Sequence, residues 1–438
     1  MAEINHAIKG TNDVLPKESY KIQFVENIML STAKLYGFRE IRVPVFEHTE
    51  AFSRNVGDTT DVVQKEMYTF DDKGGRSITL RPELTAGVVR SSIEHGLIYD
   101  ALPQKVCYIG GCYRYEKPQA GRLREFHQFG IECLGASSPA ADAEVICVAN
   151  QVLSTLGIKK ISLQINSIGC PICRKNYQQA LKEYFEANID ELCDTCKDRL
   201  QRNPMRILDC KSPVCSKIAA NAPKVIDFLC DDCKEHFEGV KKHLDSAGLK
   251  YTINPQIVRG LDYYTRTVFE FVSGDIGAQS TVCGGGRYDG LVEQMGGNPT
   301  PALGFGMGIE RLLLLMENQE TEIPDDTTCD LYIAPMGENA AYEATNLSSI
   351  LRSDGFEVAT DVCGRGLKAQ MKYADKIGAK FTMVIGDNEL ESKKAIIKNM
   401  KTGDTAEISL DNIGDEFIKT FSQTYLDNLT DTVMDFGN

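Results

Sequence analysis

With 438 residues, of which 42% are hydrophobic, the chain is too long for one ordinary core and predicts a soluble globular protein of two or three domains. Residues 1–10 contain no apolar signal segment, and the longest apolar stretch, around residues 312–316, is far too short to cross a bilayer. We therefore expect a cytoplasmic protein. The net charge of −14 argues against indiscriminate binding to nucleic acid, although a local basic face could still hold phosphates.

The first region of the chain alternates helical and strand patterns. In residues 1–165, short links between strand patterns predict antiparallel pairing, and the clearest hairpin is EMYTFDDKGGRSITLRPE. Residues 166–253 turn helical and contain paired cysteines, which predicts an insertion that packs as a separate part. Strand patterns return at 256–271 and 278–284. The segment TPALGFGMGIERLLLLMEN then predicts a strand, a glycine turn and an amphipathic helix.

A polar segment separates this region from a second one. NQETEIPDDTT, residues 318–328, contains several acids and a proline, which favours a linker. Residues 329–425 then show strand, helix, strand, helix and strand patterns, which predict a small, mainly parallel sheet flanked by helices. The end of the chain has a helical pattern, and residues 426–438 form a C-terminal tail.

TLRPELT, residues 79–85, places a carboxylate and a hydroxyl just after a strand. Pro82 fixes the local backbone, so Glu83 and Thr85 could be held toward the amine of a ligand. An ordinary polar strand end would give the same pattern, and this motif alone leaves both interpretations open.

RYEKPQAGRLREFHQFGIECLG, residues 114–135, predicts two strands around a loop that contains proline, glycine and both charges. On the returning strand, the two-residue repeat puts four residues on one face: Phe126, Gln128, Gly130 and Glu132. A surface hairpin would explain the loop. It would also leave Gln128 and Glu132 beside Phe126, where polar groups need partners.

VRGLDYYTRTVFEF, residues 258–271, puts an arginine, an aspartate and two tyrosines at the head of a strand pattern. Alternation from Tyr264 would place Tyr264 and Arg266 on one side of the strand and Tyr263 on the other. Adjacent tyrosines usually pack in a core. Arg259, however, comes just before the strand, where its guanidinium could bind an anionic ligand with two hydrogen bonds.

GFGMGIERLLLL carries Gly304, Gly306 and Gly308 ahead of Arg311. The spacing G-x-G-x-G lacks the third glycine of the dinucleotide-binding G-x-G-x-x-G, and the dipeptide Gly-Lys of a Walker A loop does not occur, so the sequence argues against a nucleotide-dependent dehydrogenase. The glycines could let a helix begin close under a bound base while Arg311 faces phosphate. Close helix packing is the alternative.

Eight of the fifteen cysteines lie in the insertion as four close pairs. Three pairs have the C-x₂-C spacing and one has C-x₄-C, which is typical of tetrahedral zinc sites, and one or two such sites could form. Free thiols or a decayed ancestral site are the alternative. A Zn²⁺ ion here would stabilise the insertion rather than act in catalysis. The predicted ligands are Cys170, Cys173, Cys193, Cys196, Cys210, Cys215, Cys230 and Cys233.

Taken in this order, the motifs resemble those of the histidyl-tRNA synthetase family of class II aminoacyl-tRNA synthetases. GFREIRVPVFE is similar to motif 1 of that class, which builds its dimer interface, RYEKPQAGRLREFHQFGIE to motif 2, and ALGFGMGIERLL to motif 3. TLRPELT, RGLDYYTR and CGGGRYDGL resemble the motifs of the histidine-specific family, and GRGLKAQMKYADKIGAKFTMVIGDNEL resembles its anticodon-binding domain. The insertion matches less well, and the tail is extra.

The resemblance implies an α/β and α+β multidomain fold. A class II antiparallel-sheet catalytic core flanked by helices would occupy residues 1–325, interrupted by the helical insertion at 166–253, and a C-terminal α/β anticodon-binding domain would occupy residues 329–425. The implied activity is that of a homodimeric, ATP-dependent histidine–tRNA ligase. It would convert L-histidine and ATP to histidyl-adenylate and pyrophosphate, with Mg²⁺ on the phosphates, and transfer histidine to the 3′ end of tRNA(His). No DNA or membrane partner is expected.

The resemblance also assigns roles to residues at the histidine site. Glu83, Thr85 and Gln128 would hold the α-amino group. Glu132 and Tyr264 would bind the imidazole from two sides, and Tyr263 would shape the pocket. Because an imidazole has two ring nitrogens that need partners, such a site would reject side chains that leave its buried polar groups unpaired.

The ATP-binding residues implied in the same way are Arg114, Glu116, Phe126, Arg259 and Arg311. Arg114 and Arg259 would contact the α-phosphate and Arg311 the γ-phosphate, while Phe126 stacks on adenine. The three arginines are the expected catalytic residues, because attack of a carboxylate on a phosphate needs fixed cations and in-line alignment more than a proton-transfer group.

A basic helix face in the last domain is a candidate tRNA contact. In the helix that begins near Gly366, Lys368, Lys372 and Lys376 recur every four residues, with Arg365 just before. A solvated lysine face is the default interpretation. The resemblance to an anticodon-binding domain favours contact with tRNA phosphates.

A catalytically silent relative is the alternative function. The regulatory subunit of ATP phosphoribosyltransferase resembles the synthetase core but serves as a histidine sensor. Such relatives typically lack the anticodon-binding domain and lose the arginines that contact ATP. This sequence has Arg114, Arg259, Arg311 and the second domain, which favours the ligase.

Overall fold

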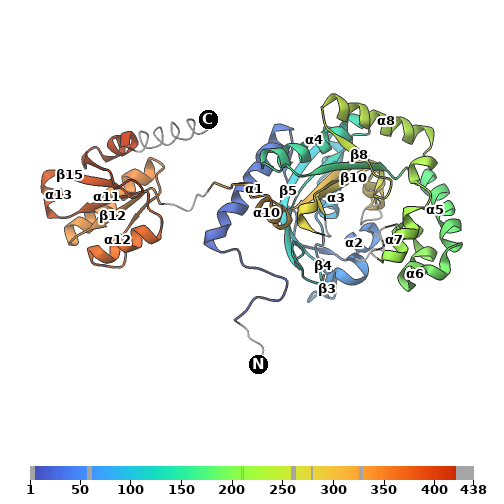
Figure 1. Cartoon of the computed structure of the whole chain (residues 1–438), viewed down its shortest axis with the longest axis horizontal. Coiled ribbons are helices and arrows are strands. Elements are labelled where there is room, and N and C mark those ends of the chain that lie inside the picture. The colour runs from blue at the N-terminus through green and yellow to red at the C-terminus, as the bar shows by residue number, and fades with distance from the viewer. Residues whose placement is uncertain are drawn as a thin grey trace. The chain divides into compact units, whose positions relative to one another are not determined.

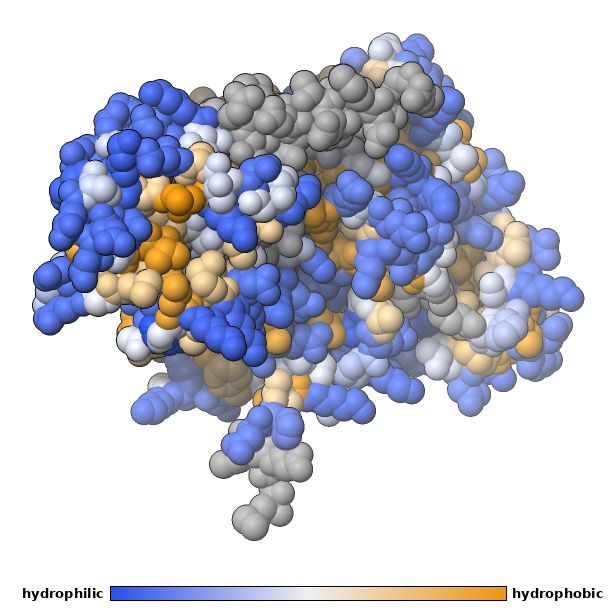
Figure 2. All heavy atoms as spheres, turned by 60° about the vertical axis from the view of Figure 1, so that its left-hand side comes forward, coloured by the Kyte–Doolittle hydropathy of each residue, from blue (hydrophilic) through white to orange (hydrophobic). Residues whose placement is uncertain are grey.

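The computed structural model describes residues 5–56, 62–208, 210, 212–257, 263–277, 280–324 and 329–420. The chain divides into two compact units, Met1–Ile323 and Pro324–Asn438, and the division falls within the segment predicted as a linker. Among the described residues, no helix is long and apolar enough to span a membrane. The face drawn in Figure 2 is mostly hydrophilic, with apolar side chains in small groups.

The first unit is built on an eight-stranded sheet with the order β1-β5-β6-β11-β10-β9-β7-β8. Neighbouring strands are antiparallel except for β1 beside β5 and β7 beside β8, which confirms the predicted antiparallel core. The strands are β1 (Arg39–Glu40), β5 (Gln104–Tyr113), β6 (Glu125–Leu134), β7 (Ser162–Ser167), β8 (Tyr251–Ile253), β9 (Thr265–Val272), β10 (Thr281–Arg287) and β11 (Ala302–Gly308).

One face of this sheet forms the main core. Phe129 and Ile131 of β6 and Phe305 of β11 are almost fully buried there, in one cluster with residues of three helices. The helices are α1 (Pro16–Leu35), α4 (Pro139–Thr155) and α10 (Ile309–Asn318). Because side chains alternate along a strand, the residues between these positions lie on the opposite face.

A three-stranded sheet, in the order β2-β4-β3, lies in the same unit. Its strands β3 and β4 are antiparallel, which confirms the predicted hairpin. The elements of this part are β2 (Phe46–His48), α2 (Glu50–Val56), the π-helical turn η1 (Val62–Glu66), β3 (Tyr68–Asp71), β4 (Ser77–Leu80), α3 (Thr85–Glu94) and the 3₁₀ turn η2 (Leu97–Tyr99). The short helix α9 (Leu291–Gln294) follows β10 and contacts α2 and α3.

The predicted helical insertion lies between β7 and β8. In Figure 1, α5, α6 and α7 gather at one side of the unit, and α8 continues from them past α4. The helices are α5 (Pro171–Glu186), α6 (Asp194–Arg202), α7 (Pro213–Ala220) and α8 (Asp231–Ser246), joined by the 3₁₀ turns η3 (Ile189–Glu191), η4 (Pro204–Ile207) and η5 (Val225–Phe228).

A buried ionic network ties α8 to the sheet. Asp142 of α4 binds the guanidinium of Arg287, which is fully buried at the end of β10, and its Oδ2 lies 3.3 Å from His236 Nε2 of α8. Burial opposes ionisation of Asp142, but hydrogen bonds from His236 and Arg287 and the charge of Arg287 lower its pKa overall. The carboxylate is therefore ionised and paired in the interior.

Two expectations about strands are wrong. Of the strand expected over residues 256–271, residues 258–262 lie outside the described residues, and Tyr263 and Tyr264 precede β9, which begins at Thr265. Arg266 has φ +52, so the regular alternation counted from Tyr264 does not occur. The pairing with β10 also shifts register between Gly286 and Arg287. In addition, GFGMG is no turn: β11 runs through these glycines to Gly308, and α10 begins at the next residue. The short 3₁₀ turn η6 (Gly274–Ile276) follows β9.

The second unit has a five-stranded sheet with the order β13-β12-β14-β15-β16. β12 is parallel to β13 and β14, as predicted, while β15 and β16 add an antiparallel hairpin that was not predicted. Residues 413–420 are helical, and the remainder of the predicted terminal helix and tail lies outside the described residues. The elements are β12 (Leu331–Pro335), α11 (Glu338–Ser353), β13 (Val358–Thr360), α12 (Leu367–Lys376), β14 (Phe381–Ile385), α13 (Asp387–Ser392), β15 (Lys394–Asn399) and β16 (Thr405–Ser409).

Candidate active site

A buried carboxylate on β6 is the centre of the candidate site. Glu132 is 1% exposed, and its Oε1 accepts hydrogen bonds from Thr85 Oγ1 at 2.8 Å and from the Tyr108 hydroxyl at 2.9 Å. Its Oε2 accepts one from the Tyr288 hydroxyl. Burial raises the pKa of Glu132 to about 8, although the three hydroxyl donors oppose the rise. The site therefore contains a buried carboxyl group that accepts hydrogen bonds from three hydroxyl groups.

The start of α3 brings a second carboxylate to the same place. Glu83 Oε2 accepts a hydrogen bond from the backbone N–H of Thr85 at 2.6 Å, and Oε1 accepts one from the backbone N–H of Ala86 at 2.9 Å. These N–H groups have no partner within the helix, and an anion beside them is favourable. Burial raises the pKa of Glu83, and the backbone donors counteract it.

Three tyrosines form an aromatic wall of the site. The rings of Tyr263 and Tyr264 are 4.8 Å apart between centroids, and those of Tyr263 and Tyr288 are 5.5 Å apart. All three side chains are buried. The guanidinium of Arg174, from the insertion, donates a hydrogen bond to the backbone carbonyl of Tyr264.

Glycines make room for these groups. Gly130 of β6 faces the Tyr108 ring so closely that a Cβ there would overlap it, and a Cβ at Gly304 of β11 would overlap the Glu132 carboxylate. Gly306, by contrast, has Gln128 as its nearest neighbour, with Nε2 3.4 Å from a hypothetical Cβ. The glycines of β11 thus clear the sheet face that carries Gln128 and Glu132.

A cationic part of the site adjoins Glu83. Arg114 Nε donates to the carbonyl of Pro82 at 2.8 Å, and its guanidinium lies over the Phe126 ring at 5.3 Å. The charge of Arg114 lowers the pKa of Glu83 somewhat against the effect of burial, so the two groups are neighbours. Phe126 is half-buried on the same face of β6 as Gln128 and Glu132.

A second guanidinium lies beside the loop after β5. Arg311 Nη1 donates to the carbonyl of Thr281 at 2.7 Å, and Nη2 donates to that of Gly121 at 3.3 Å. Burial and the nearby Arg122 lower the pKa of Arg311. Glu116 is buried, with Oε2 2.9 Å from Arg122 Nε and Oε1 3.8 Å from Arg114 Nη1.

Most residues expected at the site are thus close together. Glu83, Thr85, Glu132, Tyr263 and Tyr264 lie around one buried position, with Gln128 further along the same strand, while Arg114, Glu116, Phe126 and Arg311 lie toward the loop after β5. The expected Arg259 lies outside the described residues. Sequence reasoning assigned no role to Tyr108 or Tyr288. CGGGRYDGL, which contains Tyr288, was a usable signal, whereas nothing local singled out Tyr108.

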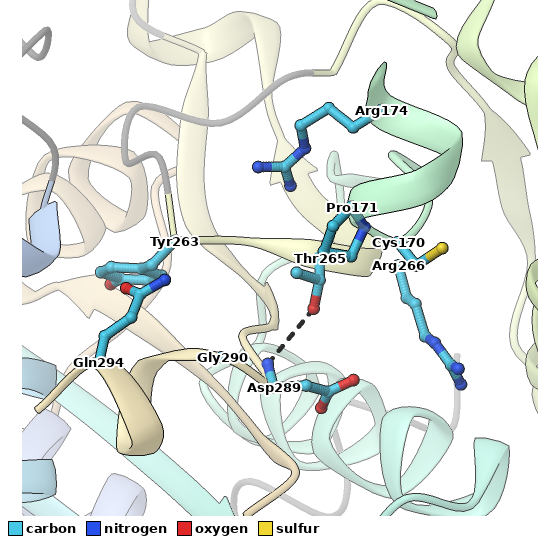
Figure 3. A pocket seen from close by; sticks show the side chains of 9 residues that line it. All are labelled: Cys170, Pro171, Arg174, Tyr263, Thr265, Arg266, Asp289, Gly290 and Gln294. Atoms are coloured by element: carbon cyan, nitrogen blue, oxygen red, sulfur yellow. Dashed lines mark hydrogen bonds between the residues drawn. The ribbon is translucent and has the colours of Figure 1, made fainter. Parts of the chain in front are cut away.

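A pocket of about 350 Å³ opens between this wall and the insertion (Figure 3). Arg174 projects from α5 on one side, and Tyr263 and Gln294 lie next to each other on the other. The backbone N–H of Asp289 donates to Thr265 Oγ1 across its floor, at 3.3 Å. The lining residues are Cys170, Pro171, Arg174, Tyr263, Thr265, Arg266, Asp289, Gly290 and Gln294.

The eight cysteines of the insertion form two separate groups. Within each group the four sulfur atoms lie within 4.8 Å of one another, so each group could hold a metal ion. The first group is Cys170, Cys173, Cys230 and Cys233, and the second is Cys193, Cys196, Cys210 and Cys215.

The predicted basic face of the second unit is solvent-exposed. Lys368, Lys372 and Lys376 lie in α12 and are all exposed. Arg365 is held differently, because its guanidinium pairs with Asp361 at 3.2 Å and lies over the Tyr373 ring at 4.3 Å.

Comparisons with known proteins agree over both units. The family model described as histidyl-tRNA synthetase matches residues 10–312, and the model described as anticodon binding domain matches residues 330–420. A histidine–tRNA ligase of Caldanaerobacter subterraneus subsp. tengcongensis is 56% identical over 94% of this chain and 98% of its own. The ligase of Acetivibrio thermocellus has the same identity and coverage.

Solved structures show the same similarity. The apo histidyl-tRNA synthetase of S. aureus is 42% identical, with a TM-score of 0.80 over 94% of this chain and 98% of its own. The histidyl-tRNA synthetase of a Nostoc species, 20% identical, has a TM-score of 0.69 over 95% of this chain and 99% of its own, which shows likeness of fold.

Proposed function

The chain belongs to the histidyl-tRNA synthetase family and is an ATP-dependent ligase that joins histidine to tRNA, and we propose that the group of residues around Glu132 is its histidine site. The observation that carries this assignment is the buried carboxyl group with three hydroxyl partners. An imidazole N–H would donate to Glu132, and Tyr264 would serve the other ring nitrogen. Side chains without two such groups could not make both of these hydrogen bonds, which would weaken their binding in the interior.

The α-amino group of histidine is assigned to the neighbouring polar groups. Glu83 is fixed by two backbone N–H donors and offers a negative charge to an ammonium group. Thr85 and Gln128 supply further oxygen acceptors on the same side. This arrangement would leave the carboxylate of histidine directed toward the cationic part of the site.

ATP is assigned to the cationic part. Phe126 would stack on adenine, and Arg114 would contact the α-phosphate while Arg311 reaches the γ-phosphate. Glu116 holds Arg122 beside them. Arg259 is proposed to complete the set at the α-phosphate. Mg²⁺ would enter with ATP as part of the substrate, on the β- and γ-phosphates.

The reaction then follows from alignment and charge. The histidine carboxylate oxygen attacks the α-phosphorus, the bond to the β-phosphate oxygen breaks, and pyrophosphate leaves. Fixed guanidinium groups stabilise the charge that gathers on the phosphate in this step. In the second step a hydroxyl at the 3′ end of tRNA(His) attacks the carbonyl of histidyl-adenylate, and AMP leaves. Any Zn²⁺ in the insertion would take no part in either step.

A homodimer is proposed from one face of the three-stranded sheet. By the strand register, Phe46, Tyr68, Phe70, Ile78 and Leu80 all lie on that face. Phe46 is 56% exposed and Phe70 is 49% exposed, which is unusual for aromatic side chains grouped together. A second copy of the chain would cover them. We place the enzyme in the cytoplasm, where tRNA is charged.

The histidine site is tested by amino-acid-dependent exchange of pyrophosphate into ATP, without tRNA, across all twenty amino acids. Exchange with histidine alone is expected, and Glu132→Ala should abolish it. Glu94→Ala, at the exposed end of α3, is the matched control and should keep it. Histidine exchange that survives in Glu132→Ala would overturn the assignment of the histidine site. Histidine binding without exchange in the wild-type chain would favour a sensor.

A further inference from the structure

The two groups of thiols in the insertion have the geometry of metal sites. In the first group, Cys170 Sγ lies 3.6 Å from Cys173 Sγ and 4.0 Å from Cys230 Sγ, and in the second, Cys193 Sγ lies 4.0 Å from Cys210 Sγ. A tetrahedral zinc ion with Zn–S bonds of about 2.3 Å holds its sulfur atoms about 3.8 Å apart. The observed separations match this value.

Other uses of these thiols fit less well. A disulfide joins two sulfur atoms at about 2.05 Å, and all eight cysteines are free in the structure. An iron–sulfur cluster would place its cysteines further apart than a single ion does. The four-sulfur donor set and the tetrahedral spacing therefore favour one borderline-soft ion in each group.

Backbone N–H groups are already turned toward the sulfur atoms. The N–H of Cys230 donates to Cys173 Sγ at 3.1 Å, and the N–H of Cys193 donates to Cys215 Sγ at 3.3 Å. Such donors stabilise thiolate ligands from outside the coordination sphere. In each group two cysteines are buried and two are half-buried.

We propose that the insertion binds two structural zinc ions, one in each group, and that the first ion also holds the insertion against the histidine site. The two sites are nested along the chain. The first joins the start of α5 to the start of α8, at the base of the insertion, and the second lies wholly between them. The second part of this proposal rests on the histidine site proposed above.

The link to the histidine site runs through α5. Cys170 is the residue before α5, and its carbonyl accepts a hydrogen bond from the backbone N–H of Arg174 at 2.9 Å, one turn further. Arg174 donates to the carbonyl of Tyr264, which is in the aromatic wall beside Glu132. In Figure 3 the Arg174 side chain extends from α5 toward the side of the pocket where Tyr263 lies, and Cys170 lies at the start of the same helix. An ion that fixes Cys170 thus fixes the position from which Arg174 projects.

The backbone is closely packed at the turn that leads into α5. Gly169 has φ +68, and a Cβ there would lie 2.5 Å from Cys173 Cβ, so the turn into α5 packs directly on a predicted ligand. The carbonyl of Gly169 also accepts a hydrogen bond from the N–H of Arg266 at 2.9 Å. Loosening the first site would therefore disturb both ends of the segment 264–266.

The zinc sites are tested first by metal analysis of the wild-type chain purified without chelator. Two zinc ions per chain are expected by elemental analysis and native mass spectrometry. Cys173→Ser with Cys233→Ser should lower the count to one, and so should Cys196→Ser with Cys215→Ser. Cys363→Ser, an exposed cysteine outside both groups, should keep two. No metal with all thiols reactive, or iron in place of zinc, would overturn the assignment without any use of activity.

The link to the histidine site is tested by the KM for histidine in pyrophosphate exchange. The first-site pair should raise this KM several-fold more than the second-site pair, while the KM for ATP changes less. Equal effects of the two pairs would overturn the link and leave the zinc count standing. If a pair fails to fold, Arg174→Ala replaces it, because this change removes the contact to Tyr264 without removing a ligand. An unchanged KM for histidine in that variant would also overturn the link.

Discussion

Glu132, in the proposed histidine site, opposes the stability of the fold as the pH rises. Its pKa is raised from 4.5 to about 8 by burial, so the folded chain favours the protonated form. The stabilising effect of that proton is complete below the unfolded pKa and is lost as the pH rises through 8. A ligand that donates a hydrogen bond to the carboxylate would restore part of this lost stabilisation.

Glu132→Gln should therefore change stability in a way that depends on pH. The unfolding free energy of the variant relative to that of the wild type should rise between pH 5 and pH 9, because glutamine does not ionise. The size of the pKa shift implies a rise on the order of a few kcal/mol. Urea unfolding of both proteins at the two pH values measures the difference. A stability difference that stays the same at both pH values would show that Glu132 does not titrate with a raised pKa. Histidine exchange should fall in the variant in either case.

Many single residues of this candidate site could be predicted from the sequence. The alternation along residues 126–132 placed Gln128 and Glu132 on one face, and the motif TLRPELT singled out Glu83 and Thr85, to which the family resemblance then gave a role. Tyr108 was missed because it reaches Glu132 from β5, which only the folded sheet brings beside β6, and Tyr288, which follows β10, was missed although its motif was noted. Their roles and those of the predicted residues stay proposals.

Among the elements, β11 shows what local patterns could not settle. Three glycines in seven residues suggested a turn, yet this segment is a central strand. The reason lies in its neighbours, since Gly304 must leave room for Glu132 of β6. Likewise, the positive φ of Arg266 occurs where its backbone pairs with Ile168 and Gly169, just after β7, and cannot be inferred from alternation.

Gly304→Ala should accordingly lower the stability of the fold. A methyl group there overlaps the Glu132 carboxylate and the backbone carbonyl of Ile131, and the backbone cannot move away cheaply. We expect a loss of at least about 1–3 kcal/mol in unfolding free energy, as for overpacked cores, together with weaker histidine exchange. Gly306→Ala is the matched control on the same strand, because its nearest neighbour is the side chain of Gln128 at 3.4 Å. Equal effects of the two changes on stability would contradict this account.

The lysine face of α12 is testable as one element. Changing Lys368, Lys372 and Lys376 together to glutamate should weaken tRNA binding strongly, because each lysine lost removes a phosphate partner and each glutamate adds repulsion. Pyrophosphate exchange should stay intact. Filter binding at two salt concentrations measures the first effect, and a shallower salt dependence is expected. Loss of exchange to the same degree as tRNA binding would reject the proposal.

For the whole molecule, composition and pattern predicted two sheet-containing regions, and the structure has them. The hairpin β15–β16 escaped prediction, although Ala395 and Ile397 of β15 are buried between exposed residues. The hydrophobic clusters of the described residues fall within one unit or the other, and none combines the two. Each unit thus has its own core.

A chain cut after Ile323 should therefore fold and retain histidine-dependent exchange. It should charge tRNA poorly, because the unit that matches the anticodon-binding domain is gone. Circular dichroism, exchange and aminoacylation on the same preparation separate these outcomes. A folded fragment without exchange would mean that the second unit supports the chemistry of the first.

The glycines on one face of the central sheet should affect how long the folded protein resists proteolysis. Gly304, Gly306 and Gly308 add no side chains of their own to that face, and in the proposed site histidine and ATP would cover it. Ligands that bind only the folded state shift the unfolding equilibrium in proportion to their excess over Kd, by about 2.7 kcal/mol at a hundredfold excess. The lifetime of the enzyme under proteolysis should then follow the supply of its own substrates, without a dedicated sensor.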